Sequence, residues 1–331
     1  MLDASLQPAL TSRANRNILR SLPSAQTLLL RSRTSDSSTR TGSGSGSGSD
    51  SSTSTTPPQS PVSDEPKTAQ LGTAKADDAG SEADAGEAVD FSSNDYLSLS
   101  SSPDLRARFL ARLHASPHIL GAGGSRLLDG GTLAHAQLED RLGAFFAAPA
   151  ALLYTSGYDA NVGFFACVPR AHDVVLFDEL IHASVHDGLR ASRAARTATA
   201  TTTGTRPFPH NDVRALGQIL VRLVGEREDV RGGAANVFVV VESLYSMDGD
   251  VAPLEAICET VERLLPNHNG HVVVDEAHAT GVYGPRGRGL VAHLGLEDRV
   301  TVRLHTFGKA LASSGGECEE PSISLNPVTF L

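Results

Sequence analysis

The chain has 331 residues, 40% of them hydrophobic, which is enough to form one large domain or two modest ones. A net charge of −10 without a long basic block argues against a nucleic-acid-binding protein, and the cysteines fit neither a disulfide framework nor a zinc site. Because no apolar run approaches the roughly 20 residues of a membrane span, we expect a soluble protein of a reducing compartment, with no nucleic-acid or membrane partner.

Residues 1–30 form the first segment, in which Leu6, Leu10 and Arg13 recur at helical spacing. The spacing predicts an amphipathic helix that reaches about Arg20. Because the segment is rich in arginine and poor in acidic residues, it is also typical of a mitochondrial presequence. A mitochondrial location, or a peroxisomal one, therefore stays open beside the cytoplasmic location that we expect.

Residues 31–88 differ sharply in composition from the rest of the chain. They are rich in Ser, Thr, Gly and Pro and end in an acidic stretch. Such a segment cannot bury enough apolar surface to offset the entropy lost on ordering. The composition therefore predicts a disordered insertion.

Globular patterning begins at Val89. Helical periodicity occurs at 135–147 and 252–265, and strand-like apolar runs occur at 150–156, 173–179, 236–243, 271–276 and 300–307. Strands that alternate with helices predict an α/β fold, with a mainly parallel sheet and helices on both faces. In such a sheet, ligands bind beyond the carboxyl ends of the strands.

The strand at 271–276 runs into the letters DEAH at residues 275–278. Nucleic-acid-dependent ATPases use this sequence to hold magnesium, but they also need a P-loop, G-x-x-x-x-G-K-[ST], earlier in the chain. Lys309 is the only lysine that follows a glycine, and it comes after the DEAH sequence. Ala310 stands where the P-loop requires Ser or Thr. The missing phosphate-binding loop excludes the ATPase interpretation.

Polar residues gather after several of the predicted strands. They are Ser156-Gly157-Tyr158, Ser243 to Ser246, Asp275 with His278, and Thr306 with Lys309. Each group alone is typical of an ordinary turn, a helix-capping aspartate or a solvated lysine. Together they provide what pyridoxal 5′-phosphate needs: an amine for a Schiff base, a carboxylate that keeps the ring nitrogen protonated, and small donors and helix N–H groups for the phosphate.

Residues 89–316 resemble the α-oxoamine synthases, a subfamily of the fold-type-I pyridoxal-phosphate enzymes in aminotransferase class I/II. The matching stretches are FSSNDYLSLS (91–100), GAGGSRLLDGGTLAHAQLE (121–139), LLYTSGYDAN (152–161), DELIHAS (178–184), FPHNDV (208–213), ESLYSMDGDVAPL (242–254), VDEAHATGVYGPRGRGL (274–290) and TFGKALASSGG (306–316). The resemblance implies the large domain of that fold and an enzyme that uses pyridoxal 5′-phosphate.

The same resemblance implies a role for each residue of the expected cofactor site. Lys309 resembles the Schiff-base lysine, Asp275 the aspartate that pairs with the pyridinium nitrogen, and His182 the histidine that stacks on the ring. We take these three residues as catalytic. His278 resembles the histidine that bonds the phenolic oxygen of the cofactor. The further cofactor contacts that it implies are Gly157 and Tyr158 at the phosphate, together with Ser246 and Thr306. No metal site is implied.

Substrate contacts are implied for Arg20, Asn94 and Ser125. The N-terminal helix of the family has the form L-x-x-A-L-x-x-R, with an arginine near its end that contacts the substrate carboxylate, and LQPALTSRANRNILR places Arg20 there. This match explains the arginine-rich helix without a presequence. Asn94 and Ser125 lie in stretches that resemble active-site loops of the family.

Two stretches resemble one branch of the family most closely. SMDGD-x-APL (246–254) and VDEAHATGV-x-GPRGRGL (274–290) resemble the 8-amino-7-oxononanoate synthases, which condense L-alanine with pimeloyl-CoA and release carbon dioxide in biotin biosynthesis. The alternatives are the 5-aminolevulinate synthases, the 2-amino-3-ketobutyrate CoA ligases and the serine palmitoyltransferases. The resemblance further implies amino-acid and acyl-CoA substrates and a homodimer of the full-length form.

The resemblance stops at Gly316. The family continues with a strand, more of the large domain and a small C-terminal domain, whereas residues 317–331 read ECEEPSISLNPVTFL. We expect this tail to be a non-family segment that does not supply the strand, and to be translated intron, since Gly316-Glu317-Cys318 can be encoded with the splice-donor sequence GTGAGT. The alternatives are a genuine truncated isoform and a catalytically inactive fragment that keeps the cofactor-site residues.

Overall fold

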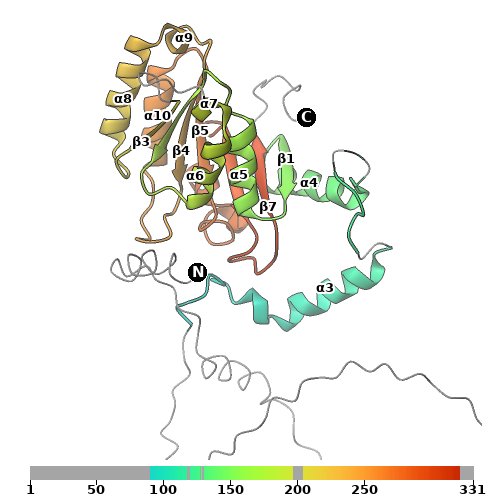
Figure 1. Cartoon of the computed structure of the whole chain (residues 1–331). Helices are drawn as coiled ribbons and strands as arrows, with labels where there is room; N and C mark the ends of the chain where they lie inside the picture. Colours follow the sequence, from blue (N-terminus) through green and yellow to red (C-terminus); the bar gives the residue numbers. More distant parts are fainter. Residues whose placement is uncertain (1–89, 118–119, 127, 129, 197–203, 321–331) are drawn as a thin grey trace, which may run out of the picture. The chain divides into compact units, whose positions relative to one another are not determined.

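The computed structural model describes residues 90–117, 120–126, 128, 130–196 and 204–320 (Figure 1). The predicted segments 1–30 and 31–88, with Arg20, lie outside the described residues. Within the described part of the chain, no helix is long and apolar enough to cross a membrane.

A sheet of seven strands organises residues 150–320, in the order β1-β7-β6-β5-β4-β2-β3. The strands are β1 (Ala150–Tyr154), β2 (Val174–Asp178), β3 (Thr205–Phe208), β4 (Val237–Glu242), β5 (Gly270–Asp275), β6 (Val302–Thr306) and β7 (Gly316–Glu320). The strands from β3 to β6 pair in parallel, and β7 pairs antiparallel with both β6 and β1. The mainly parallel α/β sheet that the sequence predicts is therefore confirmed.

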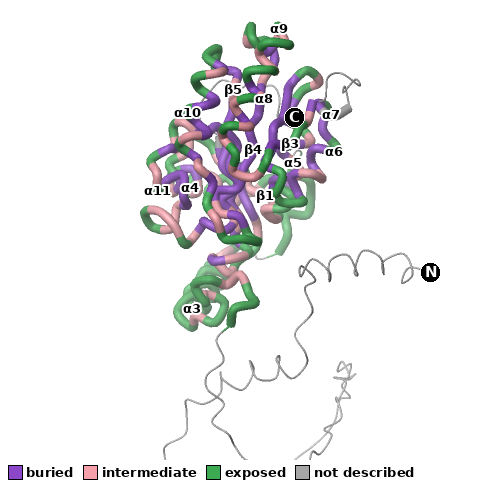
Figure 2. The backbone as a smooth tube through the Cα atoms, turned by 90° about the vertical axis from the view of Figure 1, so that its left-hand side faces the viewer, coloured by how far each residue is buried: buried purple, intermediate pink, exposed green. Residues whose placement is uncertain are grey.

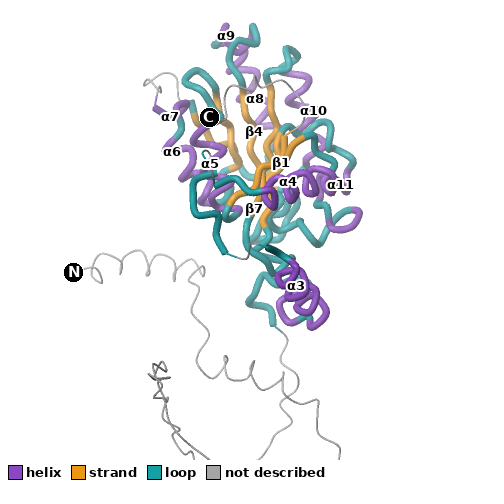
Figure 3. Tube along the Cα trace, turned by 90° about the vertical axis from the view of Figure 1, so that its right-hand side faces the viewer, coloured by secondary structure: helices purple, strands orange, loops and turns teal. Residues whose placement is uncertain are grey.

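Helices cover both faces of this sheet (Figure 3). They are α4 (Leu133–Phe146), α5 (Gly157–Cys167), α6 (Ala183–Ala191), α7 (Arg193–Arg196), α8 (Val213–Glu226), α9 (Glu228–Arg231), α10 (Leu254–Leu264) and α11 (Leu290–Leu294), with a 3₁₀ turn at Pro285–Gly287. The 3₁₀ turn Leu99–Ser101 and α3 (Pro103–Ala115) precede these helices in the chain. No residue of either segment is buried (Figure 2).

The core is divided by the sheet because successive residues of a strand point to opposite faces. In β4, Val239 packs in the cluster that contains residues of α8 and α10, whereas Phe238 and Val240 pack in the cluster that contains residues of α5 and α6. Every residue of β2 and β4 is buried. These two strands read as continuous apolar runs because helices cover them on both sides.

The strand β7 contradicts the expectation that the tail after Gly316 supplies no strand. Main-chain pairing places this segment between β1 and β6, where Cys318 lies opposite Leu152 and Leu304. The side chain of Cys318 then belongs to the same core cluster as Leu304. Ladder hydrogen bonds depend on backbone geometry rather than on apolar alternation, which is why the side-chain pattern of the tail did not predict the strand.

Candidate active site

A cavity of about 240 Å³ lies at the carboxyl ends of the parallel strands. All the residues that the sequence analysis assigned to the cofactor line this cavity, except Ser246. They come from segments that follow β1, β2, β5 and β6. The topology therefore brings together groups that lie as much as 152 residues apart, from Gly157 to Lys309.

Lys309 belongs to a chain of three side chains. Its Nζ atom lies 2.7 Å from Nε2 of His278, and Nδ1 of the same imidazole lies 2.7 Å from the hydroxyl of Tyr96. Tyr96 is 45% exposed, so the chain leads from the cavity to the surface. Sequence analysis missed Tyr96, although the residue lies within the matched stretch 91–100.

Asp275 is the last residue of β5 and is only 5% exposed. Its Oδ1 atom accepts a hydrogen bond from the backbone N–H of Ala277 (2.9 Å), and its Oδ2 atom accepts one from Nδ2 of Asn161 (2.8 Å). Both donors are neutral, so they stabilise the carboxylate without cancelling its charge. Asn161 was also missed, although it closes the matched stretch 152–161.

Glu242 adds a second carboxyl beside Asp275. It ends β4 and pairs in register with Asp275 on β5. Burial, with the nearby charge of Asp275, raises the pKa of Glu242 to about 8, so this side chain is neutral at pH 7. Sequence analysis missed Glu242, although the residue opens the matched stretch 242–254.

His182 caps the start of α6 and is held by the residues that follow it. Its Nδ1 atom lies 2.8 Å from the hydroxyl of Ser184 and accepts a hydrogen bond from the backbone N–H of Ser184 (3.2 Å). An imidazole that accepts at Nδ1 carries its proton at Nε2 when it is neutral. The ring of Tyr158 meets the His182 ring edge-on, with centroids 6.2 Å apart.

Gly157 begins α5 at the end of β1, and its missing side chain has a packing reason. A Cβ atom there would lie 2.7 Å from Cβ of Thr306, so only glycine lets the end of β6 approach the first turn of the helix. The backbone N–H groups of Asp159 and Ala160 already bond the hydroxyl and the carbonyl oxygen of Ser156, so an anion at this helix N-terminus would rely on the N–H groups of Gly157 and Tyr158. The phosphate-binding turn expected at Gly157 and Tyr158 stays a prediction.

The other predicted contacts are not brought into the cavity. Ser246 is exposed in the turn after β4, while its neighbour Tyr245 is buried. Ser125 is exposed, and its carbonyl accepts hydrogen bonds within its own loop. Asn94 is half-buried, and its Oδ1 atom lies 3.2 Å from the hydroxyl of Tyr96, which links it indirectly to His278.

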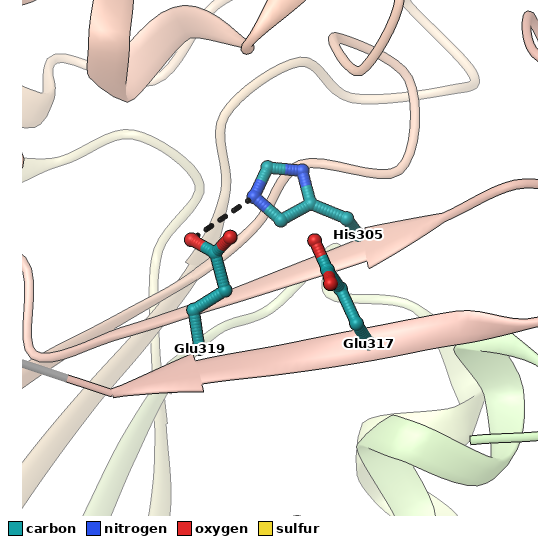
Figure 4. A group of neighbouring side chains, drawn as sticks. All are labelled: His305, Glu317 and Glu319. Carbon is teal, nitrogen blue, oxygen red and sulfur yellow. Dashed lines mark ion pairs between the residues drawn. The ribbon is translucent and has the colours of Figure 1, made fainter. Parts of the chain in front are cut away.

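A second group of ionisable side chains lies on β6 and β7 (Figure 4). Potential ligand atoms of His305, Glu317 and Glu319 all lie within 4.8 Å of one another, and all three residues are buried. Arg303 already forms an ion pair with Glu319 at 2.9 Å. Burial raises the pKa of Glu317 to about 9, so this carboxyl is neutral at pH 7. With these charges already balanced, we assign no metal ion to this group.

Comparison with known proteins identifies the same family across most of the described chain. The family model "Aminotransferase class I and II" matches residues 87–318. An 8-amino-7-oxononanoate synthase of Emericella nidulans is 53% identical over 229 residues, which cover 69% of this chain and 54% of the relative. An aminoacyl transferase sphA of Byssochlamys spectabilis is 42% identical over 231 residues, which cover 70% of this chain and 47% of the relative.

Solved structures give the same result at lower identity. Serine palmitoyltransferase of Sphingomonas wittichii superposes with a TM-score of 0.59 at 29% identity, covering 70% of this chain and 52% of that chain. Another serine palmitoyltransferase structure, with the same score, was solved with the pyridoxal-phosphate internal aldimine. This chain spans about half the length of the curated relatives that it matches. The α-oxoamine synthase resemblance inferred from the motifs is confirmed.

Proposed function

Because the chain belongs to the aminotransferase class I and II family, we propose that it carries the cofactor-binding half of a pyridoxal-phosphate-dependent acyltransferase. The observation that carries this proposal is the convergence of Lys309, His278 and Asp275 in one cavity that ends at the first turn of α5. An amine, a carboxylate and a set of anion-binding N–H groups are the donors that this cofactor requires.

The residues fit the cofactor in chemical type. Lys309 supplies the amine that would bind it covalently, and this amine must be neutral to act as a nucleophile. Asp275 supplies the negative charge that would keep a ring nitrogen protonated, and the first turn of α5 would hold the phosphate. When bound, the cofactor supplies an electron sink for a carbanion. His182, held by Ser184, supplies a flat ring at the cavity wall.

The chain of Lys309, His278 and Tyr96 gives the lysine a proton path. His278 can accept a proton from the amine at Nε2 and release one from Nδ1 toward the exposed Tyr96. Such a path lets the amine change protonation state inside a partly buried cavity. We assign to His278 both this role and the contact with the phenolic oxygen of the cofactor.

For the reaction, we propose condensation of an amino acid with an acyl-CoA, followed by decarboxylation. L-alanine and pimeloyl-CoA are the substrates favoured by the motifs at 246–254 and 274–290 and by the 53% identity to a protein named 8-amino-7-oxononanoate synthase. The second candidate is another amino acid and acyl chain, favoured by the sphA relatives and by the serine palmitoyltransferase structures. We place Arg20, Asn94 and Ser125 at the substrate, and the complete site in a homodimer.

Labelling of lysine tests the cofactor site directly. The protein is incubated with pyridoxal 5′-phosphate, reduced with borohydride and mapped by peptide mass spectrometry. Lys67 and Lys75 serve as internal controls because they lie in the segment 31–88. We expect the pyridoxyl group on Lys309 and its loss in Lys309→Arg. A folded sample that is unlabelled, or is labelled equally on all lysines, would contradict the proposal.

Substrate choice has its own measurement. L-alanine, L-serine and glycine are titrated separately into the cofactor-loaded protein while its visible absorbance is followed. A saturable change with L-alanine alone supports the first candidate, and a change with L-serine supports the second. If the cofactor binds at Lys309 and no amino acid changes the spectrum, the chain is the catalytically inactive fragment that the sequence analysis left open.

A further inference from the structure

Asn161 is a buried polar residue of the cavity wall to which neither the motifs nor the family resemblance gives a role. It lies in α5, is 3% exposed, and reaches across 114 residues of sequence to Asp275. Its Oδ1 atom has no hydrogen-bond partner among the described residues. A buried amide with an unpaired oxygen is costly, and the hydrogen bond from its N–H group to Asp275 offsets part of that cost.

The position of Asn161 is fixed by close packing of its helix. Gly188 of α6 lies against α5, and a Cβ atom at that position would be 2.8 Å from Phe165 and 3.0 Å from the carbonyl oxygen of Asn161. The start of the helix is fixed as well, because Gly157 lies against Thr306. The amide of Asn161 therefore has little freedom to move away from Asp275.

A neutral donor suits the task better than a charged one. Arginine or lysine at this place would neutralise Asp275, whereas an amide stabilises the carboxylate and leaves its charge available to a cation in the cavity. Glu242 pairs in register with Asp275 on the neighbouring strand, and burial raises the pKa of Glu242, which disfavours a second negative charge beside Asp275. The bonds from Asn161 and from the backbone of Ala277 then account for both carboxylate oxygens.

We propose that Asn161 is a positioning residue that orients the Asp275 carboxylate toward the ring nitrogen of the cofactor. The inference rests on the proposed function, because it assumes that Asp275 faces that nitrogen. The inference predicts that the electronic state of the bound cofactor depends on Asn161, although Asn161 acts on the cofactor only through Asp275.

Three variants separate this role from simple packing. Asn161→Leu removes the donor at similar volume, and Asn161→Asp keeps the shape but replaces the donor with a second carboxylate, which would share a proton with Asp275. The control is Asn269→Leu, which removes an equally buried asparagine just before β5, at the opposite end of that strand from Asp275, whose amide donates to the carbonyls of Val230 and Ala235.

The probe is pyridoxal 5′-phosphate added to the whole chain, with two readouts. The first is its dissociation constant, and the second is the pH at which the visible absorbance of the bound cofactor changes. We expect Asn161→Leu to weaken binding by about tenfold, as loss of a hydrogen bond to a charged group does, and to lower the pH of the spectral transition. Asn161→Asp should shift both further, and Asn269→Leu should shift neither.

A double-mutant cycle then tests whether Asn161 acts through Asp275. In an Asp275→Asn background, Asn161→Leu should change neither readout further. Equal effects in both backgrounds, or an unchanged spectral transition in a folded Asn161→Asp protein, would overturn the inference. Failure of the proposed function looks different, because the unmutated chain would then take no borohydride-stable label at Lys309.

Discussion

Replacement of Glu317 by glutamine should stabilise the fold at neutral pH. Glu317 is fully buried in β7, and neither of its carboxyl oxygens has a hydrogen-bond partner among the described residues. Burial, together with the charge of Glu319, raises its pKa to about 9 from an ordinary value of 4.5. The folded protein therefore keeps this proton at pH 7, whereas the unfolded chain releases it.

The magnitude follows from that difference in proton binding. Below pH 4.5 both states hold the proton, and Glu317 adds no pH dependence to stability. Between pH 4.5 and about 9 only the unfolded state loses it, so stability falls by about 1.4 kcal/mol for each pH unit. At pH 7 the penalty reaches about 3 kcal/mol, which is large beside the total stability of a domain.

Glutamine has the same shape and cannot titrate, so Glu317→Gln should remove this slope. Urea unfolding at several pH values between 5 and about 8 measures it. We expect the variant and the unmutated chain to be similar at the acidic end and to diverge as the pH rises. Glu226→Gln, at an exposed site on α8, is the matched control and should leave the slope unchanged. A stability difference that is constant with pH would refute the reasoning.

The remaining predictions concern single side chains near the same sheet edge. Asp275→Asn should cut both kcat and kcat/KM by about 10²-fold or more while cofactor still binds, because a neutral amide cannot hold a ring nitrogen protonated. Near-normal turnover of this variant would show that Asp275 does not have this role. Partial burial opposes the charged form of His210, but hydrogen bonds to Asp178 and Asp250 raise its pKa above 6.5. The ion pairs of charged His210 should add up to about 1 kcal/mol to the free energy of unfolding. This stabilisation should be present below pH 6.5 and lost as pH rises through the raised pKa, so His210→Gln should flatten the pH–stability curve over that range. Glu276→Ala should cost about 3 kcal/mol or more in urea unfolding, since it leaves buried N–H groups of α11 unpaired.

The strands were predictable wherever burial on both faces makes the sequence continuously apolar. The run predicted at 236–243 became β4 (Val237–Glu242), and the run at 271–276 became β5 (Gly270–Asp275). The strand β3, with its sequence TRPF, was missed because only Phe208 is buried and no apolar run marks it. The strand β7 was wrongly rejected because its pairing comes from the backbone, while the tail has two prolines and its side chains show no clear amphipathic period.

The cavity residues were predictable where chemistry is concentrated in one residue type. The amine of Lys309 and the carboxylate of Asp275 were recognised in combination, from their places after two strands and from the matched stretches that contain them. Asn161 and Tyr96 were not recognised, because each matters through a contact across the fold, over 114 and 182 residues respectively. A single sequence gives no measure of which loop polar residue finds such a contact, and Ser246, predicted for the cavity, lies exposed outside it.

The four letters DEAH show how one motif serves two purposes at a strand end. Asp275 and His278 face the cavity, where they meet Asn161 and Lys309. Glu276 is fully buried elsewhere, and its carboxylate accepts hydrogen bonds from the hydroxyl of Ser243 and from two backbone N–H groups at the start of α11. We therefore propose that the first and fourth letters carry the chemistry, whereas the second holds a helix in place. Substitution of Glu276 should lower stability with little change in the spectrum of bound cofactor. Substitution of Asp275 should change that spectrum with little effect on stability.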